Sequence, residues 1–198
     1  SPGEALKDSA PLLHENMGDY EHIDAIRPEP GTNIANRTKI RKGNIALGFE
    51  KSYETIEETF SFPPGDHAAM ETRATEVEIS GDGRIIIHSA TQAPFVVRSL
   101  MGINFGVDPG KVTVITHSVG GGYGGKAGMQ LEGLVYLLSK AVGGRRVKLI
   151  NTREMDMVTS PGHIGLEARV KLGATKVGEL MAAELTYMFD SGAYADYA

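Results

Sequence analysis

The chain has 198 residues, of which 41% are apolar and 23% charged, a composition typical of a globular protein with a sizeable core. A net charge of −5 without any basic run excludes the electrostatic footprint of a nucleic-acid-binding protein. No segment approaches the ~18 uninterrupted apolar residues of a membrane span, so we expect no membrane partner. The absence of cysteine excludes disulfides, thiolate nucleophiles, Cys-ligated zinc and an iron–sulfur cluster within these residues, and it fits the cytoplasm, where we expect the protein.

The first quarter of the chain differs from the rest. Residues 1–47 contain four prolines and no sustained hydrophobic period, which predicts an extended arm or linker with one short helix near Glu4–Ser9. Disorder of much of this arm is left open. Residues 48–198 are expected to form a partial domain, which opens on an alternating segment at 52–62 that predicts a strand.

Regular elements are predicted through the middle of the chain. Residues 74–90 place two β-branched runs around Ser80-Gly81-Asp82-Gly83, which predicts a hairpin. Residues 94–107 predict a helix whose apolar face contains Phe95, Val96, Leu100, Ile103 and Val107.

The second half of the chain predicts a crossover and a further hairpin. Strand 111–119, helix 128–142 and strand 146–150 predict a right-handed βαβ unit. The apolar stripe of its helix is Leu131, Leu134, Val135, Leu138 and Val142. Segments 164–172 and 179–189 predict a long hairpin. The fold class is therefore α+β, with a mixed sheet, hairpins and one βαβ-like crossover that carries a glycine-rich loop.

That loop is the segment SVGGGYGGKAG at 118–128. Glycines allow positive φ and let a ligand approach the main chain closely. A strand, such a loop and a helix N-terminus together direct several free N–H groups at one place, which predicts an anion site.

Two nucleotide motifs fit the loop incompletely. Gly120–Lys126 matches the phosphate-binding pattern G-x-x-x-x-G-K, but Ala127 stands where a Ser or Thr would ligate Mg²⁺. Gly120, Gly122 and Gly125 also match the dinucleotide pattern G-x-G-x-x-G. That pattern requires an acidic residue at the end of the next strand, to bind the ribose. The chain has Asn151 and Arg153 there, and Glu154 comes later than expected, so the pattern favours NADP over NAD only weakly, through Arg153.

A third interpretation comes from several segments in order. TQAPF at 91–95, DPGKVTVI at 108–115 and GGGYGGK at 120–126 resemble the molybdenum-binding subunit of the xanthine dehydrogenase/aldehyde oxidase family. EALKDSAPLLHEN near the start is similar to the family's linker, and residues 48–72 and 166–197 are similar to its flanking segments. The resemblance covers essentially the whole chain collinearly.

The resemblance implies a molybdopterin site, with a dinucleotide form of the cofactor left open. Gly121, Gly122, Gly124 and Gly125 would bring main-chain amides to the pyranopterin, and the N–H of Tyr123 would lie near the oxo ligand of the metal. Gln92 would donate its side-chain amide to the same oxo ligand, so the chain itself would supply no direct metal ligand.

Two departures limit what the resemblance implies. Ala127 stands where many purine and aldehyde enzymes of the family have a glutamate, which puts purine hydroxylation in doubt. The family's active-site glutamate base would lie beyond residue 198, so we assign no catalytic residue here and expect the isolated chain to be inactive. The chain is interpreted as part of a larger subunit, either an excised domain or one half of a split protein.

Other polar residues are given structural roles. The six histidines lack zinc spacing. His67 is expected to make a structural hydrogen bond near Glu71, and His163 to shape the loop beneath the cofactor. The turn REMDM at 153–157 is expected to be a solvated helical turn, and Lys126 either neutralises a cofactor phosphate or forms a salt bridge within the fold.

The function predicted from the sequence is that of a molybdenum hydroxylase component acting on an N-heterocycle or aldehyde. Its predicted partners are the remainder of the molybdenum subunit, iron–sulfur and FAD modules and a small-molecule substrate, with a homo-oligomer left open. Two alternatives remain: a βαβ protein that binds ATP or NADP, and a cofactor-free assembly module.

Overall fold

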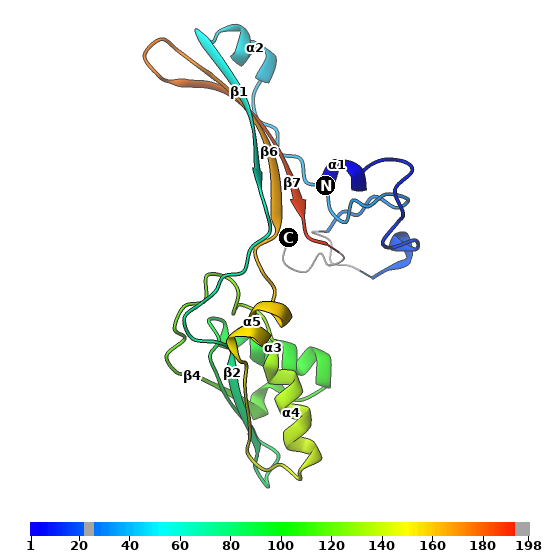
Figure 1. Ribbon diagram of the computed structural model, residues 1–198, viewed down its shortest axis with the longest axis vertical. Helices are drawn as coiled ribbons and strands as arrows, with labels where there is room; N and C mark the ends of the chain where they lie inside the picture. Colours follow the sequence, from blue (N-terminus) through cyan, green and yellow to red (C-terminus); the bar gives the residue numbers. More distant parts are fainter. Residues whose placement is uncertain (22–25, 193–198) are drawn as a thin grey trace. The chain divides into compact units, whose positions relative to one another are not determined.

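The computed structural model describes residues 1–21 and 26–192. The chain separates into two compact units, one of residues 66–163 and one that combines residues 1–65 with residues from 164 onward. The predicted arm of residues 1–47 and partial domain of residues 48–198 form a different partition, which stays a prediction. Helices and two sheets occur together, so the α+β class is confirmed (Figure 1).

The unit of residues 66–163 is built on a four-stranded mixed sheet in the order β4-β3-β2-β5. Its strands are β2 (Ala74–Ile79), β3 (Ile85–Ser89), β4 (Val112–Thr116) and β5 (Val147–Ile150). Its helices are α3 (Pro94–Phe105), the 3-10 turn η2 (Pro109–Lys111), α4 (Leu131–Ala141) and α5 (Arg153–Thr159). The expected hairpin is the antiparallel β2–β3 pair, in which Val77 lies opposite Ile87.

The crossover connectivity is more extended than a simple βαβ unit. β3 and β4 are the adjacent parallel pair, and α3 connects them. β4 and β5 run parallel at opposite edges of the same sheet, so the predicted crossover from strand through helix to strand is present, with α4 crossing over two intervening strands. β4 also ends at Thr116, which leaves residues 117–119 to the glycine loop.

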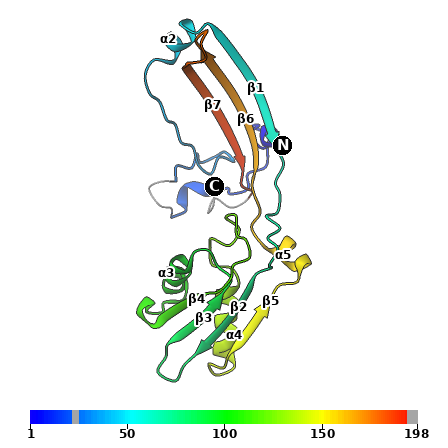
Figure 2. The same cartoon turned by 90° about the vertical axis from the view of Figure 1, so that its left-hand side faces the viewer.

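One face of this sheet is covered by α3 and α4 (Figure 2). Residues that alternate along β2 and β3 point to this face because successive side chains of a strand point to opposite sides. The core between the sheet and helices is formed by Val77, Ile85, Ile87, Val97, Met101, Val112, Val135 and Tyr136.

The faces that the helices bury differ from those predicted. α3 buries Val97 and Met101, whereas Phe95 and Ile103 are 72% and 75% exposed. α4 buries Val135 and Tyr136, while the predicted stripe residues Leu134, Leu138 and Val142 are exposed. Both helices have apolar residues on more than one side, so periodicity alone could not select the inner side.

The second unit contains a three-stranded antiparallel sheet in the order β1-β6-β7. The strands are β1 (Glu54–Phe62), β6 (Gly165–Ala174) and β7 (Leu180–Asp190), so the predicted strand at 52–62 and the long hairpin are confirmed. The unit also contains α1 (Pro2–Ala5), the 3-10 turn η1 (Met17–Asp19) and α2 (Ile45–Glu50). None of the helices in the described ranges is long and apolar enough to cross a membrane.

Candidate functional site

The glycine-rich loop connects the end of β4 at Thr116 to the start of α4 at Leu131. Its backbone takes positive φ at Gly120 (+67°), Gly121 (+98°) and Gly124 (+94°). Tyr123 also has a positive φ of 52°, which is uncommon for a residue with a side chain, and its ring is 70% exposed. This sequence of left-handed residues makes the backbone turn repeatedly.

Gln92 is attached to this loop through both its main chain and its side chain. Its N–H donates to the carbonyl of Lys126 at 3.1 Å, and its Oε1 accepts from the amides of Gly124 at 3.2 Å and Lys126 at 3.4 Å. In the described part of the chain, Nε2 of Gln92 has no acceptor. The carbonyl half of the amide therefore holds the loop, and the NH₂ half is available to a ligand.

The loop amides divide into two groups. Those of Gly124 and Gly125 are used internally, because Gly124 N–H donates to Gln92 and Gly125 N–H donates to the carbonyl of Gly122 at 2.8 Å. Those of Gly121, Gly122 and Tyr123 have no acceptor among the described residues. Three consecutive free N–H groups next to a free side-chain amide are a set of donors suited to an anionic or strongly polar ligand.

The carbonyls of the same loop are held by buried donors. Nζ of Lys126 donates to the carbonyl of Val119 at 2.6 Å and to that of Glu71 at 2.8 Å. The carbonyl of Gly125 accepts from Nε2 of Gln130 at 2.7 Å and from the guanidinium of Arg73. These donors fix the carbonyls of Val119 and Gly125, so the loop conformation is held by hydrogen bonds to the rest of residues 66–163.

Lys126 does not form the salt bridge that was one of its two expected roles. The residue is 3% exposed, and no carboxylate of the described chain pairs with it. Burial, followed by the charge of Arg73, lowers the pKa of Lys126 below its ordinary value. The prediction of a salt bridge was wrong because two main-chain carbonyls solvate the ammonium group instead.

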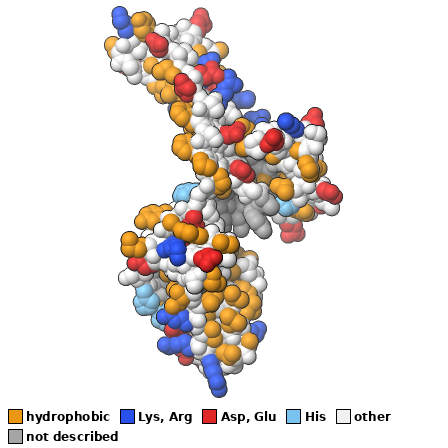
Figure 3. Space-filling view, viewed as in Figure 1, with side chains coloured by type: hydrophobic (Ala, Val, Ile, Leu, Met, Phe, Trp, Pro, Cys, Tyr) orange, Lys and Arg blue, Asp and Glu red, His pale blue; other side chains and the backbone are white. Residues whose placement is uncertain are grey.

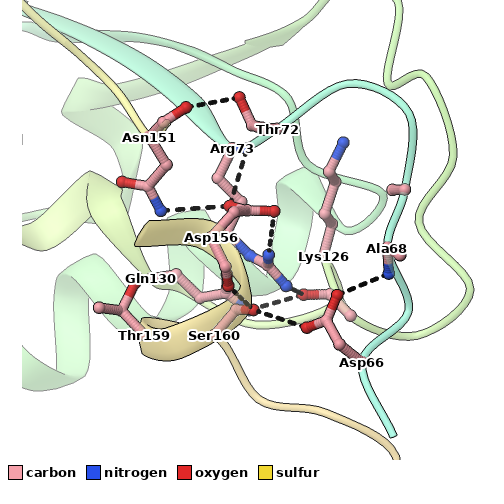
Figure 4. A network of polar contacts seen from close by, with 12 residues as sticks. Asp66, Ala68, Thr72, Arg73, Lys126, Gln130, Asn151, Asp156, Thr159 and Ser160 are labelled. Atoms are coloured by element: carbon pink, nitrogen blue, oxygen red, sulfur yellow. Dashed lines mark hydrogen bonds and ion pairs between the residues drawn. The ribbon is translucent and has the colours of Figure 1, made fainter. Parts of the chain in front are cut away.

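A buried ion pair supports the loop (Figure 4). Asp156, on α5, is 2% exposed and accepts from Nη1 of Arg73 at 2.9 Å, from the Arg73 main-chain N–H at 3.1 Å and from Nδ2 of Asn151 at 3.1 Å. Burial opposes ionisation of Asp156, but these hydrogen bonds outweigh it, so the pKa of Asp156 lies below its ordinary value. The expectation of a solvated turn at 153–157 was wrong for Asp156, while Glu154 is exposed.

Two histidines lie beneath the loop. The ring centroids of His67 and His163 are 4.2 Å apart, and a Cβ at Gly125 would lie 2.7 Å from Nδ1 of His67. Nδ1 of His67 is buried and has no hydrogen-bond partner among the described residues, so the expected structural hydrogen bond is not formed through this atom. Burial first, and then the neighbouring His163, lowers the pKa of His67.

Sequence reasoning missed Arg73, and it considered Asp156 only as part of a solvated turn. The two residues are 83 positions apart, so no local pattern indicates their pairing. Nε of Arg73 and Nη1 of Arg153 are also buried without a partner in the described part of the chain. The region behind the loop thus holds the cations of Arg73, Lys126 and Arg153 together with the carboxylates of Asp156, Glu132 and Glu71.

The geometry does not support the two nucleotide motifs. In the phosphate-binding motif the lysine reaches the phosphates, whereas Lys126 is buried and donates to main-chain carbonyls. In a dinucleotide fold the motif connects adjacent parallel strands, whereas β4 and β5 lie at opposite edges. Arg153, the residue considered for NADP, donates to the carbonyls of Ala69 and Met70.

Comparison with known proteins identifies the family. A family model described as the molybdopterin cofactor-binding domain matches residues 26–198. The chain belongs to this family. It is 29% identical to the probable hypoxanthine oxidase XdhD of Escherichia coli over 217 residues, which cover 98% of this chain and 22% of that protein. It is 27% identical to the nicotinate dehydrogenase large molybdopterin subunit of Eubacterium barkeri, over 98% of this chain and 42% of that protein.

Solved structures agree with this family assignment. Reconstituted CO dehydrogenase from Oligotropha carboxidovorans superposes with a TM-score of 0.72 over 96% of this chain and 24% of that one, at 22% identity, which shows a shared fold. Quinoline 2-oxidoreductase from Pseudomonas putida gives a TM-score of 0.66 at 28% identity, over 76% of this chain and 19% of that one. The chain spans about a quarter of the first curated relatives that it matches.

The site's own chemistry fits the cofactor named by the family. Side chains are excluded where the backbone must come close, since a Cβ at Gly122 would overlap Oε1 of Gln92. The donors are uncharged amides, backed by buried cationic charge from Arg73 and Lys126. Such a set suits a pterin that carries negatively charged groups without offering a competing metal ligand, and no cluster of metal-ligating side chains occurs in the described residues.

Proposed function

We propose that this chain is the part of a molybdenum hydroxylase that holds one side of the molybdopterin cofactor, for oxidative hydroxylation of an N-heterocycle or an aldehyde. When bound, the cofactor supplies the redox chemistry that places a water-derived oxygen on an electron-poor carbon. The observation that carries the proposal is the set of three unpaired amides, Gly121, Gly122 and Tyr123, beside the free Nε2 of Gln92 among the described residues.

The residues of this chain orient the cofactor. The amides of Gly121, Gly122 and Tyr123 donate to its polar groups, and Gln92 adds one further donor without adding charge. Gly124 and Gly125 act through the turn that they form, because their own amides are used within the site. Lys126 and Arg73 hold the loop carbonyls, so they are positioning residues.

The other predicted modules belong to the proposal as well. With no cysteine in the chain, iron–sulfur centres and FAD would reside on partner modules, and electrons would leave through them. The substrate-activating base would lie in the remainder of the molybdenum subunit. The relatives' names point to N-heterocycles and aldehydes as substrate classes, and Ala127 favours a substrate that is not a purine.

Elemental analysis of the complex purified from the native cell through a tag on this gene tests the proposal. Near-stoichiometric molybdenum is expected. Gly122→Ala should strongly reduce the molybdenum content, because the new Cβ overlaps Gln92, whereas Gly81→Ala, at a glycine with open space, should not. A complex without molybdenum, from cells that load other molybdoenzymes, would refute the proposal.

Gln92→Glu separates the proposal from the cofactor-free assembly module. The variant keeps an acceptor oxygen for the amides of Gly124 and Lys126 but loses the NH₂ donor. We expect a loss of turnover in the complex and a changed metal spectrum with the loop retained. An assembly module predicts no effect of this substitution on any activity of the complex.

A further inference from the structure

The sheet β1-β6-β7 has two faces of opposite character. In the antiparallel register Ile56 lies opposite Leu172, Phe60 opposite Ala168 and Phe62 opposite Leu166. β7 continues the same face, since Tyr187 and Phe189 lie opposite Ala168 and Leu166 on the other side of β6. We call this the apolar sheet face; its largest members are Ile56, Phe60, Phe62, Leu185, Tyr187 and Phe189.

The opposite face is polar and partly covered. Glu57 on β1 accepts from Nε of Arg169 at 2.7 Å and lies 3.7 Å from Nζ of Lys171. α2 packs on this side, because a Cβ at Gly173 would meet the ring of Phe49 at 3.0 Å. An antiparallel sheet normally packs its apolar face on a core and leaves the polar face in water, and here the polar side is the one with a helix on it.

The apolar sheet face is exposed in the described chain. Its six large members range from 47% exposed, at Phe60 and Leu185, to 60%, at Ile56. Figure 3 shows hydrophobic side chains along this sheet. Three strands of nine to eleven residues present a face on the order of 400 Å², which is as large as the largest apolar patch of a typical monomer.

A second copy of the chain is a poor occupant for this face. The face contains two charged side chains, Glu54 at its end, opposite Ala174, and Glu58 in its middle, opposite Val170, and it has no Lys or Arg. Two copies packed face to face would therefore bury these carboxylates without a cation. An area on the order of 400 Å² is also about half of the ~800 Å² per partner in a stable interface.

We propose that the apolar sheet face is the docking surface for the rest of the molybdenum-binding subunit, through a segment with an apolar side and one Lys or Arg placed against Glu58. The first relatives are about four times longer than the matched region, so the remainder of such a subunit is long enough to contain a segment of this kind. This inference rests on the proposed membership of a larger molybdenum subunit.

Cysteine accessibility tests the docking, because the chain has no native cysteine. Phe60→Cys labels the apolar sheet face, and Thr59→Cys, the adjacent exposed residue on the polar face, is the matched control. In the isolated 198-residue chain both should react with a maleimide at similar rates. In the complex purified from the native cell, Phe60→Cys should react at least about tenfold more slowly than in the isolated chain. The reaction rate of Thr59→Cys should be the same in both.

Equal labelling of the two positions in the complex would overturn the proposal. Protection of Phe60→Cys in the isolated chain that rises with concentration would also overturn it, in favour of a second copy. If a variant fails to fold, oxidative footprinting of the unmodified protein replaces it: Tyr187 should be protected in the complex relative to the isolated chain, and a Tyr187 that is equally oxidised in both overturns the proposal.

The charge requirement and the proposed function are tested separately. With Glu58→Gln, Phe60→Cys should stay protected in the complex, whereas with Glu58→Lys it should react as fast as in the isolated chain, and equal protection with both variants would refute the cation opposite Glu58. Molybdenum is measured in the same preparations. If Phe60→Cys is protected but the complex contains no molybdenum, the proposed function is refuted and the docking proposal stands. If the complex contains molybdenum but Phe60→Cys is not protected, the docking proposal is refuted and the proposed function stands.

Discussion

The two units of this chain differ in how completely the apolar face of their sheet is covered. In residues 66–163, the helices α3 and α4 cover one face of the four-stranded sheet, and Val77, Ile87, Val97 and Met101 are completely buried. In the other unit, the three-stranded sheet has a comparable apolar face, but its large side chains are about half exposed. The first unit therefore contains its own core, and the second carries one half of a core.

The two units also differ in how far their ion pairs are exposed to water. Behind the glycine loop, Arg73 and Asp156 form an ion pair that is almost completely excluded from water. On the three-stranded sheet, Glu57 and Arg169 form theirs on the exposed polar face. Rigid support for a ligand site requires the buried kind, because its partners cannot exchange with water.

The largest expected effect is the loss of the buried ion pair. Asp156→Asn leaves the guanidinium of Arg73 buried without a counter-charge, which should lower the free energy of unfolding by about 3–5 kcal/mol. Chemical denaturation of the 198-residue chain measures it. Glu154→Gln, an exposed position on the same helix, is the control and should have little effect. Equal effects of the two substitutions would contradict the assignment of Asp156 as a structural support.

The contrast between the two cores can be measured directly. Met101→Ala should destabilise residues 66–163 by about 2–5 kcal/mol, because it opens a cavity in a closed core. Phe60→Ala should change the stability of the isolated chain by about 1 kcal/mol or less, because its ring is already half exposed. Hydrogen exchange resolves the two units separately. A large effect of Phe60→Ala in the isolated chain would show that the apolar sheet face is already covered.

Acidification should act on the histidine pair. The pKa of His67 lies below its ordinary value of 6.5, so the unfolded chain takes up this proton before the folded chain does. The stability contributed by neutral His67 is present above pH 6.5 and is lost as the pH falls from 6.5 to the lowered pKa. Denaturation midpoints measured across this range should fall in the native chain and fall less in His67→Phe. Identical profiles would contradict the burial of a neutral imidazole.

The smallest expected effect is on the polar sheet face. Glu57→Gln removes the exposed ion pair with Arg169 and Lys171. Because water and salt screen such pairs, we expect only a slight loss of thermal stability at low ionic strength and none at high salt. A loss that persists at high salt would indicate that this face, too, is buried.

Much of the fold could be predicted from local patterns. The two β-branched runs around the turn at 80–83 predicted the first hairpin, and alternation at 52–62 predicted β1, because a strand that is buried on one side repeats every two residues. The glycine loop and Gln92 were identified in the sequence, and the order of the matching segments indicated the family that comparison then confirmed. Which loop amides are free could not be predicted, since that depends on the contacts of Gln92 and Gly122 across the loop.

The sequence by itself thus determined the secondary elements, the family and the place of the loop, because these depend on short-range periodicity and on motifs. Only the tertiary structure decided the sheet order, the inner sides of α3 and α4, and the pairing of Arg73 with Asp156. The physical reason is that the sequence of a helix with apolar residues on several sides does not specify which side is buried. Packing against the sheet selects that side. Likewise, Arg73 and Asp156 are 83 residues apart in the sequence, and only the fold brings them together. The fold also places Nζ of Lys126 next to the main-chain carbonyls to which it donates.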